Sequence, residues 1–432
     1  MALAKAKSPS KSSKLKSGTA SRAKAAPARD AHDADVIIVG GGLAGLTLSA
    51  LLGSQGVQVI CIDREAVPDT TSKQFDLRTT AISYASHLVL KDAGVWPLLK
   101  DQTCPIKDIR ILDGGSPVLL NFLSEDIGDM PFGWIVNNLD LRLALHKRIT
   151  GLKTVTHLAP ATVSDFDIDG KTAQVTLADG KTLSASLIIG ADGKNSTVRQ
   201  YMKAPLHGWM YGQSAIVCVV GHEHPHNNMA IEHFRSEGPF AVLPMTDAPD
   251  GTHRSSLVWS VHGDQRTTPM DYDEDTFNAA LTARFPSDYG AVHVIGKRAI
   301  WPLGLQHVHT YIAPRMALVA EAAHAMHPIA GQGLNMGLRD IGCMAGLLAT
   351  AHQKGQDMGS DDLLRNYQRE RHFDNMMMMA ATDGLTKLFS NNIPLLAPLR
   401  KLGVALVQKI PPARQFFMRQ AMGLKGLGSG HG

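Results

Sequence analysis

The chain has 432 residues, of which 44% are apolar, so it has room for two or three globular domains with large cores. No apolar run approaches the length of a membrane span, which argues against a transmembrane helix. The four cysteines are scattered without metal-ligand spacing, a usage typical of a reducing compartment rather than a disulfide framework (Cys61, Cys104, Cys218, Cys343).

The net charge of +4 conceals two basic ends and an acidic body. Residues 1–29 hold eight Lys/Arg and residues 384–432 hold seven, with no acid in either segment, so the body between them carries −11. This is not a nucleic-acid-binding composition; it predicts local attraction to an anionic surface. Residues 1–30 are too poor in large apolar side chains to fold. We expect a disordered basic tail, either solubilising or a targeting segment.

A glycine motif lies between a predicted strand, residues 36–39, and a predicted helix, residues 43–53. Its glycines, Gly40, Gly42 and Gly45, form the pattern G-x-G-x-x-G. Gly40 allows the tight turn, Gly42 lets a pyrophosphate approach the backbone, and Gly45 lets the helix pack on the strand. The phosphates would lie at a helix N-terminus, where free N–H groups and the helix dipole favour an anion.

An acidic residue follows at the distance that this motif requires. The predicted strand 57–62 ends at Asp63, 18 residues beyond Gly45, where a ribose hydroxyl needs an acceptor. A lone glycine motif is a weak signal, but two strands and the acid together predict dinucleotide binding.

Two arginines are further candidates for binding the dinucleotide. Arg78 precedes a segment that we expect to be helical, and Arg142 lies on the helix predicted for residues 138–149. Arg78 could bind a pyrophosphate or a ribose, or it could form a surface ion pair with Asp76.

Apolar and polar residues alternate along residues 153–190, as expected for a β-meander. The last predicted strand, residues 187–189, runs into Asp192 and Gly193 and places them at a strand's carboxyl end, where open α/β sheets bind ligands. Residues 208–302 are rich in predicted strands and look like an inserted sheet domain. The chain then returns to the first domain through a strand at residues 316–320, a loop at 328–332 and helices at 333–350 and 361–380.

Three separated motifs resemble those of the class A flavoprotein monooxygenases, the para-hydroxybenzoate-hydroxylase-like aromatic hydroxylases. The first is the glycine motif, and the second is Asp192-Gly193 with Ser196 and Arg199. The third runs from Ala320-Glu321 through His324 and Pro328 to Gln332, Gly333 and Asn335. The order of the three motifs along the chain makes the resemblance specific.

Within this class the chain is most similar to the ubiquinone-biosynthesis hydroxylases of the UbiH/UbiF/VisC type, over about residues 34–424. The matching residues are Asp76, Arg78, Ala81, Ile82 and Ser83, residues 328–335, and Tyr367, Arg371, Thr382 and Asp383. The resemblance implies that FAD is the cofactor and that Arg78 and Arg142 contact it.

The resemblance also implies an α/β fold with a Rossmann-like FAD-binding domain of three-layer ββα architecture. An inserted mixed-sheet substrate domain and a C-terminal helical region complete it. We assign the chain accordingly: residues 1–30 to the tail, 31–105, 137–205 and 304–360 to the FAD-binding domain, 106–136 and 206–303 to the substrate domain, and 361–432 to the C-terminal helices.

The chain departs from the family pattern at Ala320-Glu321, where relatives usually have Gly-Asp. The family's Asp accepts hydrogen bonds from the ribityl hydroxyls of the flavin. Glu321 keeps both acceptor oxygens but adds a methylene. We expect a shifted backbone and retained binding.

The third motif has a physical rationale. A helix beginning near Gly333 would point its N-terminus at the flavin pyrimidine ring, where the reduced flavin carries negative charge. Gly331 and Gly333 would let the backbone approach the ring closely. By resemblance, Pro328 lies beside the reactive edge of the flavin, and Gln332 and Asn335 complete the cofactor-binding motif.

The resemblance implies the chemistry of the class. NAD(P)H reduces the flavin, O2 adds to it, and the flavin hydroperoxide delivers a hydroxyl to an electron-rich ring, while the protein orients the cofactor and excludes water. This implies no metal. Because no second glycine motif is present, NAD(P)H would bind transiently.

Three smaller features have competing interpretations. His324 and His327 are three residues apart, but no further ligand lies near them in sequence, so we expect a packed His324 rather than a metal site. A methionine run at residues 376–379 is expected to be an adaptable helix core rather than a redox element. Three aromatic residues could line a substrate pocket or pack in the core (Tyr201, Tyr211, Trp259).

The C-terminal stretch combines apolar residues with cations and has no acid. One interpretation is contact with an anionic membrane, and the other is docking on the acidic body of the protein itself. The residues concerned are Leu388, Phe389, Leu395, Leu396, Leu399, Arg400, Lys401, Leu402, Leu406, Val407 and Lys409.

We therefore expect an FAD-dependent monooxygenase that hydroxylates the aromatic ring of a polyprenylated phenol in ubiquinone biosynthesis, with NAD(P)H and O2. The alternatives are a same-class hydroxylase of a small soluble phenol and a non-catalytic assembly subunit that has lost flavin. Expected partners are the phenol, a membrane surface and a ubiquinone-synthesis complex, and no nucleic acid. We expect a cytoplasmic protein, peripheral at the inner membrane, or one at the mitochondrial matrix face if the basic tail is a transit peptide.

Overall fold

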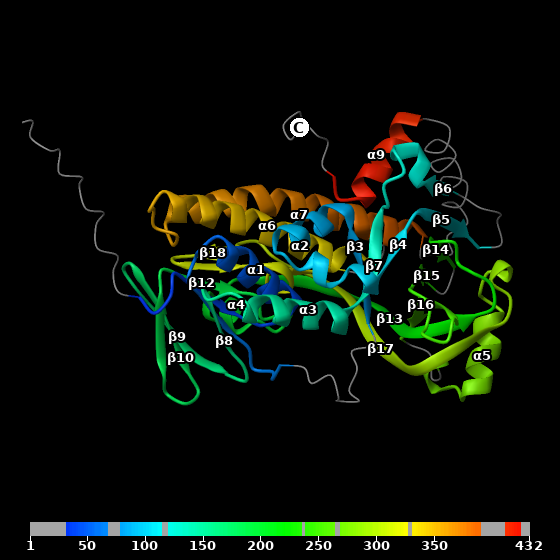
Figure 1. The fold of residues 1–432 in the computed structure, drawn as a ribbon, viewed down its shortest axis with the longest axis horizontal. Helices are drawn as coiled ribbons and strands as arrows, with labels where there is room; N and C mark the ends of the chain where they lie inside the picture. Colours follow the sequence, from blue (N-terminus) through cyan, green and yellow to red (C-terminus); the bar gives the residue numbers. More distant parts are fainter. Residues whose placement is uncertain are drawn as a thin grey trace, which may run out of the picture. The chain divides into compact units, whose positions relative to one another are not determined.

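The computed structural model describes residues 32–67, 78–114, 120–235, 238–263, 268–326, 331–389 and 411–424. The basic tail, Asp76, His327, Pro328 and most of the C-terminal apolar stretch lie outside these residues. The chain folds as a mixture of helices and several sheets (Figure 1). In the described ranges, no helix is both long enough and apolar enough to cross a membrane.

A six-stranded, mostly parallel sheet carries the glycine motif. Its order is β18-β19-β12-β1-β2-β8, and only β18, at the edge, pairs antiparallel. Every residue of β1, β2 and β12 is buried, which explains their continuous apolar runs. The strands are β1 (Val36–Val39), β2 (Val59–Ile62), β8 (Val155–Leu158), β12 (Leu187–Gly190), β18 (Ile312–Ala313) and β19 (Met316–Leu318).

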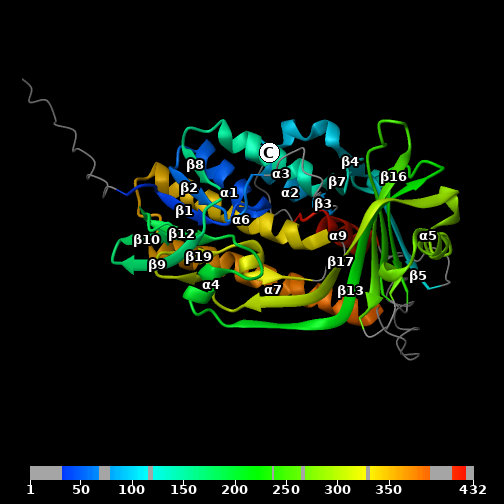
Figure 2. The same cartoon turned by 90° about the horizontal axis from the view of Figure 1, so that it is seen from below.

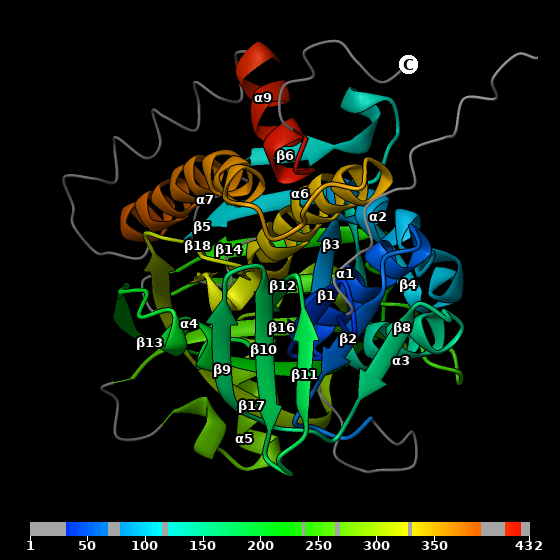
Figure 3. The same cartoon turned by 90° about the vertical axis from the view of Figure 1, so that its left-hand side faces the viewer.

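The predicted meander is present as a three-stranded antiparallel sheet that packs beside β1 and β12 (Figure 3). Every second residue of β10 and β11 is buried, so that one face of this sheet joins the core. They are β9 (Val163–Asp169), β10 (Thr172–Leu177) and β11 (Thr182–Ala185).

An eight-stranded mixed sheet forms the second large unit of structure, in the order β20-β17-β13-β16-β15-β14-β5-β6. It takes strands from both segments that we assign to a substrate domain, because β5 pairs in parallel with β14; the domain limits themselves stay a prediction. The long strands β13 and β17 run from this sheet back toward the glycine-motif sheet (Figure 2). The strands are β5 (Asp108–Asp113), β6 (Leu120–Leu123), β13 (Leu206–His222), β14 (Met229–Phe234), β15 (Phe240–Pro244), β16 (His253–His262), β17 (Val292–Val308) and β20 (His324–Ala325).

A small sheet, β3-β7-β4, connects the two larger ones. The expectation that Arg78 directly precedes a helix is wrong, because Arg78 precedes the strand β3 and the helix α2 begins only at Tyr84. The strand predicted at residues 316–320 also ends early, at Leu318. The strands of the small sheet are β3 (Thr79–Ser83), β4 (Thr103–Ile106) and β7 (Gly133–Asn137).

The helices that position the site are α1 and α6, while α7 packs beside α6 (Figure 1). Helix α7 is longer than the sequence predicted, because it continues to Phe389. The helices are α1 (Leu43–Ser54), α2 (Tyr84–Asp92), α3 (Asn138–Thr150), α4 (Thr197–Tyr201), α5 (Glu274–Thr282), α6 (Gln332–Gln353), α7 (Asp361–Phe389) and α9 (Pro411–Ala421). Short 3₁₀ turns are η1 (Trp96–Leu98), η2 (Lys100–Gln102), η3 (Ser124–Ile127), η4 (Pro269–Asp271), η5 (Ser287–Tyr289) and η6 (Ala320–Ala322).

Candidate functional site

The glycine motif forms a tight turn between β1 and α1. Gly40 has φ +109°, and a Cβ there would lie 2.4 Å from the Ala191 carbonyl oxygen. A Cβ on Gly45 would lie 1.8 Å from the Gly40 carbonyl oxygen, so each position requires glycine. A Cβ on Gly42 would meet nothing within 4 Å, and no side chain caps α1 there. The open space and the uncapped N–H groups fit a pyrophosphate.

Asp63 directly follows β2 and lies in the same cavity as the glycine turn. Its carboxylate accepts a hydrogen bond from the Glu65 backbone N–H at 3.1 Å and lies 3.6 Å from the Arg142 guanidinium. Arg142 also pairs with Glu65 at 3.2 Å, while its buried Nε has no hydrogen-bond partner among the described residues. The structure thus brings Asp63 and Arg142 together, as a ribose-binding pair would require.

Arg78 lines the same cavity, and its guanidinium lies over the Trp301 ring, 4.8 Å from the ring centroid. The stacking orients the cation at the boundary between the small sheet and the large one. This position is compatible with a contact to a dinucleotide.

Asp192 and Gly193 follow β12 and face the cavity. One Asp192 carboxylate oxygen accepts hydrogen bonds from the Thr197 backbone N–H at 2.7 Å and the Thr197 hydroxyl at 2.9 Å. The other oxygen is buried and has no partner among the described residues. The loop is further held by Arg199, which donates to the Ala322 and Lys194 carbonyls at 3.0 and 2.6 Å. Asp192 therefore has one acceptor to spare for a ligand hydroxyl.

Ala320 adopts a left-handed backbone conformation, φ +53°, which favours glycine. Its N–H donates to Asp340 at 3.1 Å, and its Cβ lies 2.7 Å from where a Cβ on Gly337 would be. The missing side chain of Gly337 therefore makes room for Ala320. The chain retains a glycine-like turn at this departure from the family pattern, and Glu321 lines the cavity from an exposed position.

Asp340 on α6 is the centre of a buried network that sequence reasoning missed. It lies 2.5 Å from His324 Nε2, 2.9 Å from Arg371 Nε and 3.0 Å from Asn375 Nδ2. Although burial opposes ionisation, His324 and Arg371 lower the pKa of Asp340 to about 2. The network holds η6 against α6. In the sequence, the signal for this network was Asp340 itself, an acidic residue within a helix of mainly small and apolar residues.

Helix α6 begins at Gln332, with Gly331 at φ +61° before it. Asn335 fixes this N-terminus: its Oδ1 accepts from the Ser83 N–H at 2.9 Å, and its Nδ2 donates to the Ala81 and Gly331 carbonyls at 2.7 and 2.8 Å. Gly331, Gln332 and Gly333 all line the cavity, and a Cβ on Gly333 would meet nothing within 4 Å. The helix N-terminus thus points at open space suited to an anionic ring.

These loops and the large sheet share one cavity of about 1080 Å³. One end is bounded by the glycine turn, Asp63, Asp192 and the start of α6. The other end is mainly apolar and receives side chains from several strands and from α9. Its walls include Ile106, Ile109, Ile111, Leu120, Phe122, Phe132, Val217, Leu243, Val258, Trp301, Leu303, Phe417 and Ala421.

The three aromatic residues that could have lined a substrate pocket are not among these residues. Trp259 is buried in the core on the α5 side of the large sheet, and Tyr201 packs on Phe166 with ring centroids 5.2 Å apart. Tyr211 donates a hydrogen bond to Asp383 at 3.0 Å. Sequence reasoning therefore missed the actual wall, because single apolar residues that alternate in a strand do not show which face is a cavity.

The remaining histidine and methionine predictions have mixed outcomes. His324 is packed in the Asp340 network, as expected, whereas His327 lies outside the described residues. In the methionine run, Met379 is buried, but Met376 and Met377 are exposed, so the core prediction is wrong for these two. Helix α7 turns part of this run toward solvent.

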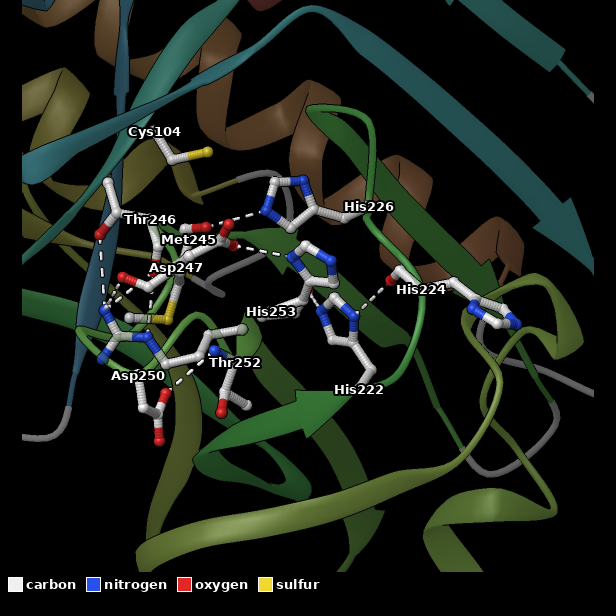
Figure 4. A network of polar contacts seen from close by, with 12 residues as sticks. Cys104, His222, His224, His226, Met245, Thr246, Asp247, Asp250, Thr252 and His253 are labelled. Atoms are coloured by element: carbon white, nitrogen blue, oxygen red, sulfur yellow. Dashed lines mark hydrogen bonds and ion pairs between the residues drawn. The ribbon is translucent and has the colours of Figure 1, made fainter.

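Three histidines, His222, His226 and His253, lie near one another (Figure 4), at the end of the large sheet where β13 pairs with β16. His222 bonds to the His224 carbonyl and the Ser255 hydroxyl, at 2.8 and 3.0 Å. His226 bonds to the Met245 carbonyl at 2.8 Å, and His253 pairs with Asp247 at 3.1 Å. Because each ring has a protein partner, we interpret this cluster as structural.

Comparisons with known proteins agree with this geometry. The model of the family described as FAD binding domain matches residues 33–382. The chain is 42% identical over 397 residues to the ubiquinone hydroxylase UbiL of Rhodospirillum rubrum, with 91% of each chain covered. It is 31% identical over 392 residues to the 3-demethoxyubiquinol 3-hydroxylase of Escherichia coli, covering 90% of this chain and 98% of that one.

Among solved structures, the p-nitrophenol 4-monooxygenase PnpA of Pseudomonas putida superposes with a TM-score of 0.74 at 16% identity, covering 91% of this chain and 99% of PnpA. This likeness confirms the Rossmann-like α/β fold. The chain therefore belongs to the FAD-dependent aromatic hydroxylases, in the family that contains the ubiquinone hydroxylases, and its cofactor is FAD.

Proposed function

We propose that this protein hydroxylates the aromatic ring of a polyprenylated phenol in ubiquinone biosynthesis, with NAD(P)H and O2 as co-substrates. The observation that carries the proposal is the single cavity that joins the dinucleotide loops to a large apolar compartment. The relatives named as ubiquinone hydroxylases support it.

The residues at the dinucleotide end have the chemistry to hold FAD. Backbone N–H groups at the start of α1 would bind the pyrophosphate, Asp63 a ribose, and the N-terminus of α6 the pyrimidine ring. When bound, FAD takes a hydride from NAD(P)H and activates O2 for transfer of one oxygen atom to the ring. We assign the binding to Gly40, Gly42, Gly45, Asp63, Arg78, Arg142, Asp192, Gly193, Glu321, Gly331, Gln332, Gly333 and Asn335. The role that the resemblance implies for Pro328 stays a prediction, because this residue lies outside the described ranges.

The apolar end favours a lipid-like substrate over a small soluble phenol. Its walls bury aliphatic and aromatic side chains from β4, β5, β6 and β15, and this surface would gain stability by covering an isoprenoid chain. Phe417 on α9 lines the cavity and is also 44% exposed. The tail of the substrate would therefore leave the cavity beside α9.

We also propose that the C-terminal region contacts a membrane surface, from which a polyprenylated phenol would enter. The basic residues of α9 suit an anionic surface. Arg414 pairs with Asp126 of the body, so at least this cation docks on the protein itself. Membership of a ubiquinone-synthesis complex belongs to the same proposal.

The first test is the visible spectrum of the purified protein, followed by NAD(P)H oxidation with and without ortho-geranylphenol. We expect a flavin spectrum, faster oxidation with the phenol, and one oxygen atom from labelled O2 in the product. A flavin spectrum with no response to prenylated phenols, but a response to small phenols, would favour a soluble substrate. A protein that stays colourless with added FAD would overturn the enzymatic function.

A further inference from the structure

One carboxylic acid lies in the otherwise apolar end of the cavity. Glu232 is on β14, where Ala230 packs with the residues of the cavity wall and Ile231 packs with the core on the α5 side. Because strand side chains alternate, Glu232 faces the cavity with Ala230. Its neighbours across the sheet, Ile111 on β5 and Ala241 on β15, also line the cavity.

No group in the described part of the chain accounts for this acid. Among the described residues, none forms a hydrogen bond or an ion pair with the Glu232 carboxyl. Arg110 and His233, on the same two strands, are engaged elsewhere: Arg110 pairs with Asp288 at 3.4 Å, and His233 bonds to the Gly114 carbonyl at 2.8 Å. Glu232 is half-buried. A polar group that is largely withdrawn from water without a protein partner is costly, so such a group is usually kept for a ligand.

Within the described wall of the apolar end, Glu232 is also isolated from other charges. Of the described residues with which the large sheet lines the cavity, it alone has an ionisable side chain. The other ionisable residues that line the cavity belong to the dinucleotide end and the adjoining start of β3: Asp63, Arg64, Glu65, Arg78, Arg142, Asp192, Lys194 and Glu321. Burial raises the pKa of Glu232 to about 7, so the carboxylate would accept protons readily near neutral pH.

We propose that Glu232 is the catalytic base that receives the hydroxyl proton of the phenol as the ring is hydroxylated. This inference rests on the proposed function. The phenol O–H bond breaks, its proton goes to a Glu232 carboxylate oxygen, and its electron pair becomes the C=O bond of a dienone. The ring carbon uses a π electron pair to bond to one oxygen atom of flavin-activated O2. The O–O bond breaks, and the second oxygen atom, reduced by the two electrons from NAD(P)H, leaves as water. The proton on that ring carbon passes to solvent water, which restores the aromatic ring, and Glu232 returns its proton to the ring oxygen.

The test compares Glu232→Gln, which keeps the shape but cannot accept the proton, with Glu274→Gln at an exposed position on α5. For Glu232→Gln we expect the same flavin content and the same flavin reduction by NAD(P)H, but about 100-fold slower hydroxylation of ortho-geranylphenol. The acid limb of the wild-type pH profile, near pH 7, should disappear. Hydroxylation within threefold of wild type, or an acid limb that survives, would overturn the proposal.

A binding measurement decides the proposal even if the wild type hydroxylates nothing. The probes are ortho-geranylphenol and its methyl ether, which has no proton to donate. We expect the wild type to prefer the phenol by about 10-fold, and Glu232→Leu to bind both about equally, because a hydrogen bond to a charged group is lost. An unchanged preference in Glu232→Leu refutes the role of Glu232, whereas a wild type that binds no FAD refutes the proposed function.

A different observation points to a second site, at His307, His309 and His372. Ring nitrogens of these three side chains lie within 4.8 Å of one another. His307 is 5% exposed, and neither of its ring nitrogens has a hydrogen-bond partner among the described residues; the same holds for His372 Nε2. His307 thus differs from His222 in Figure 4, both of whose ring nitrogens are hydrogen-bonded.

We infer that these three histidines bind one Zn²⁺ ion. Zinc takes imidazole nitrogens at about 2.0–2.1 Å, and three such ligands plus water form a common site. In a tetrahedral zinc site the ligand nitrogens lie about 3.4 Å apart, so these nitrogens need to approach one another by at most about 1.4 Å, and the exposed side chain of His309 can supply much of this movement.

The experiment is a titration of the tag-free holoenzyme with Zn²⁺ against a chromogenic chelator. We expect the wild type to bind one equivalent of Zn²⁺, and His372→Ala and His309→Ala to bind it at least about 10-fold more weakly. The control His224→Ala changes an exposed histidine outside the cluster and should bind Zn²⁺ as the wild type does. No binding below about 100 μM, or equal binding in all variants, would overturn the site.

Discussion

The two ends of the cavity are built from different kinds of sequence. At the dinucleotide end, short continuous segments provide the walls, and backbone groups at the start of α1 and α6 are the main groups available to bind the cofactor. At the substrate end, the walls consist of single side chains, such as Val217, Glu232 and Leu243, each from a different strand. The cofactor site can therefore be built from local motifs, whereas the substrate site is assembled by the pairing of strands that are distant in sequence.

The strongest way to break the dinucleotide end is to disturb the network beneath it. Asp340→Asn removes the charge that faces His324 and Arg371, and we expect the free energy of unfolding to fall by about 3–5 kcal/mol. Urea denaturation measures this change. Because the pKa of Asp340 is lowered to about 2, the wild-type advantage should shrink as the pH falls below about 4. The control Asp361→Asn, at an exposed pair with Arg365, should change stability by less than about 0.5 kcal/mol.

A second change separates FAD binding from folding. A side chain on Gly42 meets no protein atom, so Gly42→Val should fold normally yet occupy the space of the pyrophosphate. We expect FAD affinity to drop about 100-fold, which corresponds to about 2.7 kcal/mol. Titration of the apoprotein with FAD by fluorescence measures it, with Gly346→Val, at an exposed and open position of α6, as the matched control. Unchanged FAD affinity in Gly42→Val would place the pyrophosphate elsewhere.

At the substrate end, the stability that Glu232 contributes should fall as the pH rises, whereas the contribution of Asp340 falls as the pH decreases. Burial raises the pKa of Glu232 from 4.5 to about 7, so between these pH values the folded protein holds a proton that the unfolded chain has lost. Stability from this group therefore falls as pH rises through that window. We expect Glu232→Leu to be more stable than wild type by about 2 kcal/mol at pH 8 and by much less at pH 5. Thermal unfolding at both pH values measures this difference, and a pH-independent difference would contradict the raised pKa.

The smallest effect is expected at Ala320. Replacing Ala320 by glycine relieves the left-handed strain at φ +53° but leaves a small void beside Gly337, so stability should rise by less than about 1 kcal/mol. FAD affinity should stay within twofold of wild type. A large gain in FAD affinity would show that the alanine disturbs the flavin contact of Glu321.

Several features of the candidate site were predictable because they depend on local spacing. The glycine turn, Asp63, Asp192 and the start of α6 follow from strand, turn and helix signals within a few residues of each motif, and the family resemblance rests on the same segments. Errors arose where tertiary context overrode local pattern. Arg78 precedes a strand because residues 79–83 pair with β7, and part of the methionine run faces solvent because α7 packs only one of its sides.

The sequence by itself determined the Rossmann-like unit, the dinucleotide loops and the family, because glycine geometry and buried parallel strands leave a strong local signature. Only the tertiary structure decided which residues line the substrate end. Strand β14 packs on both of its faces, with Ile231 toward the core on the α5 side and Ala230 toward the cavity wall, so the sequence around Glu232 cannot show which face borders a cavity. Likewise, Asp340 on α6 meets Arg371 and Asn375 on α7, and His307 and His309 at the end of β17 meet His372 on α7. The packing of α7 against α6 and against the end of β17 brings these groups together, and the spacing of residues in the sequence does not reveal it.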